Sequence, residues 1–129
     1  MAPKTSVLAK VLGDREVEEE AIVRTRLTEL LGIKYPIVQG AMNWVSFPPL
    51  VSAVCNAGGL GILGASSMTP QELQDNIRQI KATTDKPFGV NILAGNPILD
   101  DLLDVIIGEK VAVCSYGIGN PKHMIDRMK

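Results

Sequence analysis

Four short polar segments hold the residues of this 129-residue sequence that could do chemistry. Each follows an apolar run, and together they span residues 39–43, 64–66, 91–93 and 115–120. They offer amide side chains, backbone amides, glycines and a methionine. They contain neither a carboxylate pair nor a nucleophile beside a base, which acid–base and covalent catalysis require. The pattern therefore favours a surface for a neutral planar ring over a hydrolytic centre, and we assign no catalytic residue.

Three residues in these segments have two interpretations each. Asn91 is polar inside the apolar run FGVNIL. It either hydrogen-bonds to neighbouring strands or contacts a ligand, and the residue types favour neither. For Gln39 the structural interpretation is slightly favoured. For Met42 we expect packing in the core.

The remaining reactive residue types have structural explanations. The sequence has one histidine, His123, and two cysteines, Cys55 and Cys114. A zinc site usually needs more such ligands, so we predict no metal. We interpret His123 as a surface residue, the thiols as buried and structural, and the aspartates within 100–104 as a solvated helix face.

The elements that position the polar segments alternate between strand and helix. Apolar runs predict strands at 37–39, 60–63, 88–93 and 111–115. A polar residue followed by proline precedes each intervening helix, and these helices are expected to open near residues 46, 69, 96 and 120. Thr69 and Glu72 have the spacing of a capping box. The strands are continuous apolar runs, which is typical of a parallel sheet buried on both faces.

Two α/β architectures fit this alternation: part of a (β/α)₈ barrel, or a small doubly wound sheet. The segment QGAMNW after the first strand does not match a dinucleotide-binding fingerprint. Glycines instead flank the second strand, at 58, 59, 61 and 64. Glycine in a strand indicates crowding or the close approach of a ligand, and we expect a flat ligand across several strand ends.

Composition predicts a cytoplasmic protein. The net charge is −1, which argues against a nucleic-acid surface. No apolar run reaches the length of a membrane span, and the first residues do not form a secretory signal. We divide the chain into a polar arm, residues 1–20, and a domain, residues 21–129. A lead-in helix is expected over 21–31, with apolar positions Val23, Leu27, Leu30 and Leu31 and a C-cap at Gly32.

Three blocks of the sequence resemble a known family. ELLGIKYPIVQGAM, VSAVCNAGGLGILG and TTDKPFGVNIL are similar to the N-terminal part of the nitronate monooxygenase family. FMN-dependent enoyl-acyl carrier protein reductases belong to the same superfamily, and QGAMNWV and YGIGNP look closer to that branch. The resemblance implies a TIM barrel, of which this chain has the first four βα units.

The same resemblance implies where FMN would bind. The flavin would lie across the carboxyl ends of the strands, against the backbone of Gly40, Ala41, Met42 and Asn43. Asn91 would match the family's FMN-contacting asparagine. The loops that begin at Gly64 and Gly117 would line the same opening.

The function implied by the resemblance is oxidation of alkyl nitronates by an FMN-dependent oxidoreductase. One alternative is an FMN-dependent enoyl-acyl carrier protein reductase, which would use an enoyl thioester and NAD(P)H. Another is a non-catalytic half barrel. The family's catalytic histidine lies in a later Gly-Gly-His motif that this chain lacks, as it lacks the phosphate site, and His123 does not match that motif. Because both outer strands would have open edges, we expect self-association or pairing with a complementary half.

Overall fold

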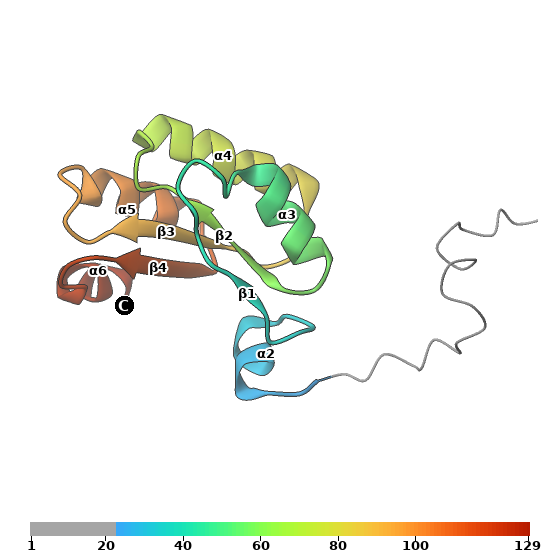
Figure 1. The fold of residues 1–129 in the computed structure, drawn as a ribbon. Coiled ribbons are helices and arrows are strands. Elements are labelled where there is room, and N and C mark those ends of the chain that lie inside the picture. Colours follow the sequence, from blue (N-terminus) through green and yellow to red (C-terminus); the bar gives the residue numbers. More distant parts are fainter. Residues whose placement is uncertain (1–22) are drawn as a thin grey trace, which may run out of the picture.

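A computed structural model describes residues 23–129 (Figure 1). The polar arm expected over residues 1–20 lies outside this range. The strands are β1 (Val38–Gln39), β2 (Leu60–Gly64), β3 (Gly89–Leu93) and β4 (Val113–Gly117). The helices are α2 (Arg26–Leu31), α3 (Pro48–Asn56), α4 (Pro70–Thr83), α5 (Leu99–Gly108) and α6 (Lys122–Met128).

The order of the strands decides between the two architectures. All pairs are parallel, and the spatial order is β1-β2-β3-β4. A doubly wound sheet reverses its order at a switch point, whereas a barrel adds strands in sequence. The described residues therefore form a half barrel, as the family resemblance implies.

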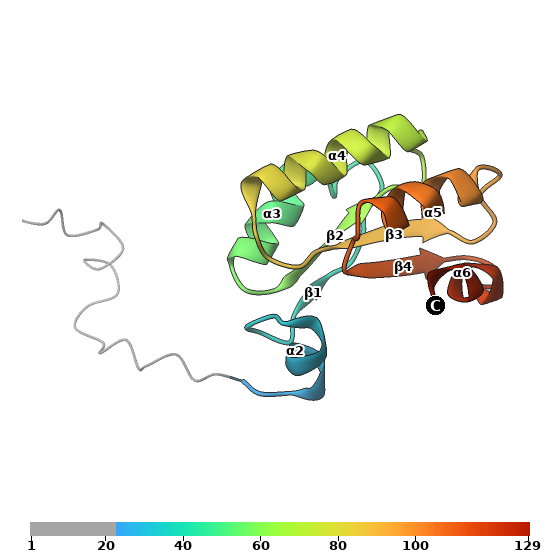
Figure 2. The same ribbon diagram turned by 180° about the vertical axis from the view of Figure 1, so that it is seen from behind.

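The outer face of the sheet is covered by helices. Figures 1 and 2 show α3, α4 and α5 on one side of the strands. Sixteen buried residues form one continuous core there, with Leu63, Val90 and Ile92 supplied by the strands and Met124 by α6. This side holds most of the apolar area that folding removes from water, and so most of the stability.

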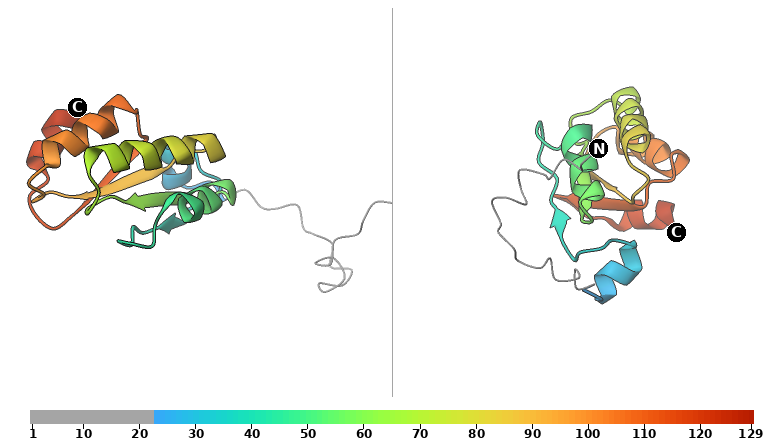
Figure 3. Two further views of the ribbon diagram at one scale, coloured as in Figure 1. Left: turned by 90° about the horizontal axis from the view of Figure 1, so that it is seen from above. Right: turned by 90° about the vertical axis from the view of Figure 1, so that its right-hand side faces the viewer.

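The inner face, which would line the barrel, has a much smaller core. Only Ile33, Leu60 and Ile62 are buried in this cluster, and Val113 packs partly against them. In the end-on view of Figure 3, α2 lies on the opposite side of the strands from α4 and α5. The segment that follows α2 brings Ile33 to this cluster.

Local sequence signals explain several boundaries. At the start of α4, Thr69 and Glu72 form the predicted capping box, and Pro70 is the first helical residue. At the end of α2, Gly32 has φ +66°, the left-handed C-cap conformation that glycine adopts without steric cost. Both predictions are confirmed.

The lead-in helix differs from the prediction. Within the described residues it begins at Arg26, because Thr25 and Thr28 form their own capping box there. Its predicted apolar face is largely open: Leu30 is 76% exposed, whereas Thr28 is buried. The helical spacing is real, but most of this face has no covering layer.

Two later boundaries were also predicted wrongly. Helix α5 begins at Leu99 rather than at the expected position near 96, since Asn96 instead accepts a hydrogen bond from Ile98 N in a turn. Strand β4 begins at Val113 rather than 111. Val111 N still donates to Ile106 O, and Lys110 has φ +53°, so both residues complete the end of α5.

Candidate binding site at the strand ends

Ser46 holds the turn that follows β1. Its side chain is 2% exposed, and its Oγ accepts hydrogen bonds from Met42 N and Gln39 Nε2, both at 2.8 Å. Its own N–H donates to Met42 O at 2.8 Å. One buried hydroxyl thus fixes both ends of the turn. Sequence reasoning expected a helix to open at this residue and missed its role in the turn, and α3 begins instead at Pro48.

Gln39 connects this turn to β2. Its Oε1 accepts from Ile62 N at 3.3 Å, and its Nε2 also donates to Gly40 O. The amide therefore replaces part of the strand ladder where β1 ends. The structural interpretation of Gln39 is confirmed.

Gly64 allows the turn to lie directly on the end of β2. A Cβ at this position would be 3.0 Å from Met42 O, too close for an unstrained contact. Gly64 N also donates to Ser46 O at 3.2 Å. The absence of a side chain therefore lets backbone pack on backbone, which is the close approach that strand glycines indicate.

Asn91 lies in the same row of the sheet as Gly64 and Ser115, which pair with it in register on either side. Its Nδ2 donates to Ser115 Oγ at 2.9 Å, and the residue is half-buried. The neighbouring strand thus supplies a partner, through a side chain rather than the backbone. An amide group has further hydrogen-bonding capacity, so the contact leaves Asn91 able to bind a ligand.

Exposed apolar side chains border the turn. Met42 is 45% exposed, so the expectation that it packs in the core is wrong. The reason is that its backbone, rather than its side chain, makes the contact with Gly64. Trp44 is 71% exposed and has φ +65°, a conformation that is strained for a bulky residue. Such strain often accompanies function.

A cavity of about 170 Å³ lies beside the turn. Its lining comes from the turn, the end of β2 and the first part of α4, and comprises Trp44, Phe47, Gly64, Ser67, Met68, Glu72 and Asn76. Ser67 Oγ donates to Asn43 Oδ1 at 3.1 Å, which joins the two loops at one edge. The cavity and the Asn91 row therefore meet at Gly64.

The turn also presents unpaired backbone donors. Within residues 23–129, no hydrogen bond involves the N–H of Ala41 or Asn43. A Cβ built on Gly40 would meet nothing within 4 Å, so the chain is open there. Free N–H groups beside open space suit the polar edge of a planar heterocycle.

The loop after β4 completes the predicted set. Gly117 ends β4, and its carbonyl accepts from Ala94 N at 3.2 Å. Ile118 is 84% exposed with φ +46°, and Gly119 has φ +111°. The structure thus places Gly64 and Gly117 at the carboxyl ends of their strands and residues 40–43 directly after β1. Asn91 lies in the middle of β3 and pairs in register with Gly64.

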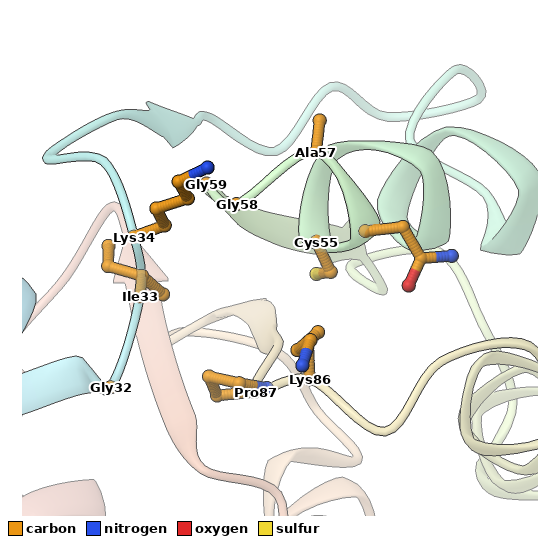
Figure 4. A pocket seen from close by; sticks show the side chains of 10 residues that line it. Gly32, Ile33, Lys34, Cys55, Ala57, Gly58, Gly59, Lys86 and Pro87 are labelled. Carbon is orange, nitrogen blue, oxygen red and sulfur yellow. The ribbon is translucent and has the colours of Figure 1, made fainter. Parts of the chain in front are cut away.

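A second cavity, of about 220 Å³, lies at the opposite end of the strands, near their amino ends (Figure 4). It is lined by Ile33, Lys34, Cys55 and Lys86 among others. The thiol of Cys55 accepts a hydrogen bond from Gly61 N at 3.3 Å, and burial raises its pKa. Barrel enzymes place their sites at the carboxyl ends of the strands, so we do not assign the site here.

The other reactive residue types have structural roles. His123 Nε2 lies 2.6 Å from Asp100 Oδ1 on the exposed side of α5 and α6, as predicted for a surface residue. Arg127 binds both Asp100 and Asp104, which joins the two helices. Burial raises the pKa of Cys114 to about 11, so this half-buried thiol is a poor nucleophile.

Charge around the site is low. Among the described residues, the four loops that follow the strands contain no lysine or arginine, and Lys122 comes only where α6 begins. The site can therefore hold a neutral ring through backbone and amide groups, but it offers no cationic group for a phosphate.

None of the helices in the described range is long and apolar enough to cross a bilayer.

Comparison with known proteins agrees with this geometry. FabK from Thermotoga maritima is 49% identical and superposes with a TM-score of 0.80, covering 82% of this chain and 34% of that structure. The "(3aS,4S,5R,7aS)-5-hydroxy-7a-methyl-1-oxo-octahydro-1H-indene-4-carboxyl-CoA dehydrogenase" of Mycobacterium tuberculosis is 49% identical over 107 residues, which is 83% of this chain and 30% of that protein.

A nitronate monooxygenase of Paraburkholderia phytofirmans is 48% identical over 75 residues, 58% of this chain and 20% of that protein. The chain thus spans about a third or less of the length of these three relatives. Residues 24–105 match the model of the nitronate monooxygenase family. On its sequence and its half-barrel fold, the chain belongs to the nitronate monooxygenase family.

Proposed function

We propose that this chain forms the ring-binding part of an FMN-dependent oxidoreductase. The turn after β1 supports this most directly. Ser46 holds it rigidly, while the N–H groups of Ala41 and Asn43 have no partner among the described residues. Donors that are fixed before a ligand arrives bind it at a low entropic cost.

In this proposal each part of the site contacts a different part of the cofactor. The backbone of residues 40–43 would hold the polar edge of the flavin ring, and Asn91 would add a side-chain hydrogen bond. Met42 would contact its apolar part, while Gly64 and Gly117 leave space across the strand ends. The bound flavin would supply hydride or electron exchange, and these residues would orient it.

A thioester is the substrate class that the comparisons support best. One match, over 107 residues, is to a protein whose name gives a carboxyl-CoA compound as its substrate. The match to the nitronate monooxygenase of Paraburkholderia phytofirmans extends over only 75 residues. NAD(P)H would be the hydride source for a reductase. Nitronate oxidation is the second candidate, supported by the family match. A substrate base would come from outside this chain.

The experiment is a fluorescence titration of the 129-residue chain with FMN and, separately, riboflavin. Trp44 is the only tryptophan in the sequence, so its emission reports on the strand ends alone. We expect quenching by both ligands with dissociation constants within a few-fold of each other, since the loops lack a cationic phosphate partner. N-acetyltryptophanamide corrects for light absorbed by the flavin.

Two variants locate the binding. Asn91→Ala should weaken flavin binding about tenfold, which corresponds to roughly 1.4 kcal/mol for one lost hydrogen bond. Asn56→Ala removes an amide at the end of α3, beside the cavity of Figure 4, and should leave binding unchanged. If saturating flavin leaves the Trp44 emission unaltered, or if both variants bind equally, the proposal fails.

A further inference from the structure

We propose that the amino ends of β3 and β4 form a second binding site, which takes the diphosphate group of a small molecule. The site is a cavity between two loops, residues 84–88 before β3 and residues 109–112 before β4. It lies at the opposite end of the strands from the proposed flavin site, so either proposal can fail without the other.

Basic residues are distributed unevenly between the two ends of the sheet. In the described range, the four loops that follow the strands contain no lysine or arginine. Three of the four loops that precede the strands contain one lysine each, namely Lys34, Lys86 and Lys110. The whole chain has a net charge of −1, so a general excess of basic residues does not explain this difference. A positive end on a nearly neutral protein favours an anionic ligand.

A cavity of about 490 Å³ lies between two of these loops. Three lysines, Lys81, Lys86 and Lys110, line it together with a single carboxylate, that of Asp85. Both loops connect a helix to a strand that the structure describes, and β3 and β4 are neighbours in the sheet. The cavity therefore belongs to the space between two adjacent βα units and does not arise from an uncovered strand edge.

The nearby carboxylates leave this end of the sheet positively charged. Glu109 is 15% exposed, and two cationic side chains of α4 each lie 3.0 Å from its carboxylate oxygens, so its charge is already balanced. Asp85 is 87% exposed and lies 3.5 Å from Lys86 Nζ, an ion pair that water weakens. The ammonium of Lys110 has no hydrogen bond or ion pair within residues 23–129.

The backbone of Lys110 gives an independent argument. Its φ is +53°, the left-handed conformation in which a helix commonly places glycine just after its end. Glycine would adopt this conformation without steric cost, whereas lysine is strained in it. Strain at an exposed position suggests a function, and the ammonium is what a glycine would lack.

The residue types favour phosphate over other anions. Lysine binds phosphate as a point charge, whereas a planar carboxylate is recognised best by the fork of an arginine. No arginine of the described chain lines the cavity, and its lysines and volume suit two linked phosphate groups. Phe88, the aromatic residue of the lining, is 5% exposed and offers no ring on which a base could stack. The site should therefore recognise the diphosphate and not the group attached to it.

Calorimetric titration of the 129-residue chain with sodium pyrophosphate, free of divalent metal ions, tests the proposal. We expect saturable binding of one equivalent, and adenosine diphosphate should bind within a few-fold of pyrophosphate. Orthophosphate should bind about tenfold more weakly. Trp44 emission should not change, because Trp44 follows β1 at the other end of the strands. Absence of saturable binding, or equal binding of adenosine, would overturn the proposal.

Two variants locate the site. Lys110→Gly removes the ammonium and leaves a residue that adopts φ +53° freely, so we expect a folded, stable chain that binds pyrophosphate about tenfold more weakly. Lys86→Gln should weaken binding to a similar extent. A lysine with only a structural role would give the reverse result for Lys110→Gly, a lower melting temperature with unchanged binding, and that would contradict the proposal.

Lys122→Gln is the matched control. It removes the same charge at the start of α6, at the other end of the sheet, and should bind pyrophosphate as the native chain does. Circular dichroism checks that all three variants fold. If Lys122→Gln loses as much affinity as Lys86→Gln, the attraction is spread over the whole surface and the proposed site is wrong.

Discussion

The two faces of the sheet differ in how completely they are built. The outer face has a core of sixteen buried residues sealed by helices, and side chains such as Leu63 and Leu102 are fully buried. The inner face buries three residues, and Val38 remains 43% exposed. Each βα unit can cover its own outer face with its own helix. The inner face needs strands from the far side of a barrel, which four units do not contain.

Leu63→Ala should have the largest effect on stability. Leu63 is fully buried on the outer face of β2, so its truncation should lower the free energy of unfolding by about 2–5 kcal/mol. Val38→Ala on the inner face should cost less than about 1 kcal/mol. Urea unfolding at one fixed protein concentration measures both. Equal losses would mean that the two faces are equally well packed.

Gly61→Ala tests how closely a helix packs on the outer face. A Cβ at this position would lie 2.5 Å from Val51 O in α3, and backbone cannot yield easily. We expect a loss of about 1–3 kcal/mol in the free energy of unfolding. Gly108→Ala is the matched control, because a Cβ there meets nothing within 4 Å. Thermal unfolding compares the two variants. Similar melting temperatures for Gly61→Ala and Gly108→Ala would contradict the close contact between β2 and α3.

Ser46→Ala tests the turn that follows β1. Removing the buried hydroxyl leaves Met42 N–H without its acceptor and removes one of the acceptors of Gln39 Nε2, which should cost about 1–2 kcal/mol. Flavin binding, followed by Trp44 emission, should weaken as well. Thr83→Ala, at the exposed end of α4, is the control and should change neither measurement. Unchanged flavin affinity in Ser46→Ala would show that the turn is held by other contacts.

Asp100→Asn should have the smallest effect on stability, because it removes an exposed contact between α5 and α6. Hydrogen bonds from His123 and Arg127 lower the pKa of Asp100 below its ordinary value of 3.8. A lowered carboxyl pKa stabilises the folded state above that ordinary value, and this contribution is lost as the pH falls through the folded pKa. The native protein should therefore lose stability on acidification below about pH 4.

Removal of the Asp100 carboxylate should reduce that loss, and the effect should be small because the pair is exposed. Melting temperatures between pH 5 and pH 2.5 measure it. Asp101→Asn is the control, since Asp101 forms no ion pair within the described range. Identical pH profiles for native protein and Asp100→Asn would remove any role for the pair in holding α6.

The fold was predictable from sequence where the signals are local. The capping box at Thr69, the C-cap at Gly32 and the alternation of strands and helices all depend on neighbouring residues. The position of Gly64 at the end of its strand followed from the same alternation, whereas Asn91 lies in the middle of β3. The family resemblance then gave the barrel, which local patterns left open.

The site was less predictable because its details depend on contacts across the sheet. Ser46 became important only because Gln39 and Met42 both reach its hydroxyl. Met42 was expected in the core, yet its side chain is exposed, since the contact with Gly64 uses backbone. Neither residue type nor spacing reveals which atoms of a turn make the contact.

The sequence by itself determined the kinds of elements, their order and the polar composition of the strand ends. Caps, proline positions and apolar periodicity act within a few residues, and they suffice for that. Only the tertiary structure decided that the strands add in sequence, that one face is sealed and the other open, and that β4 begins at Val113. These features depend on hydrogen bonds and packing between distant segments, whose geometry exists only once the chain has folded.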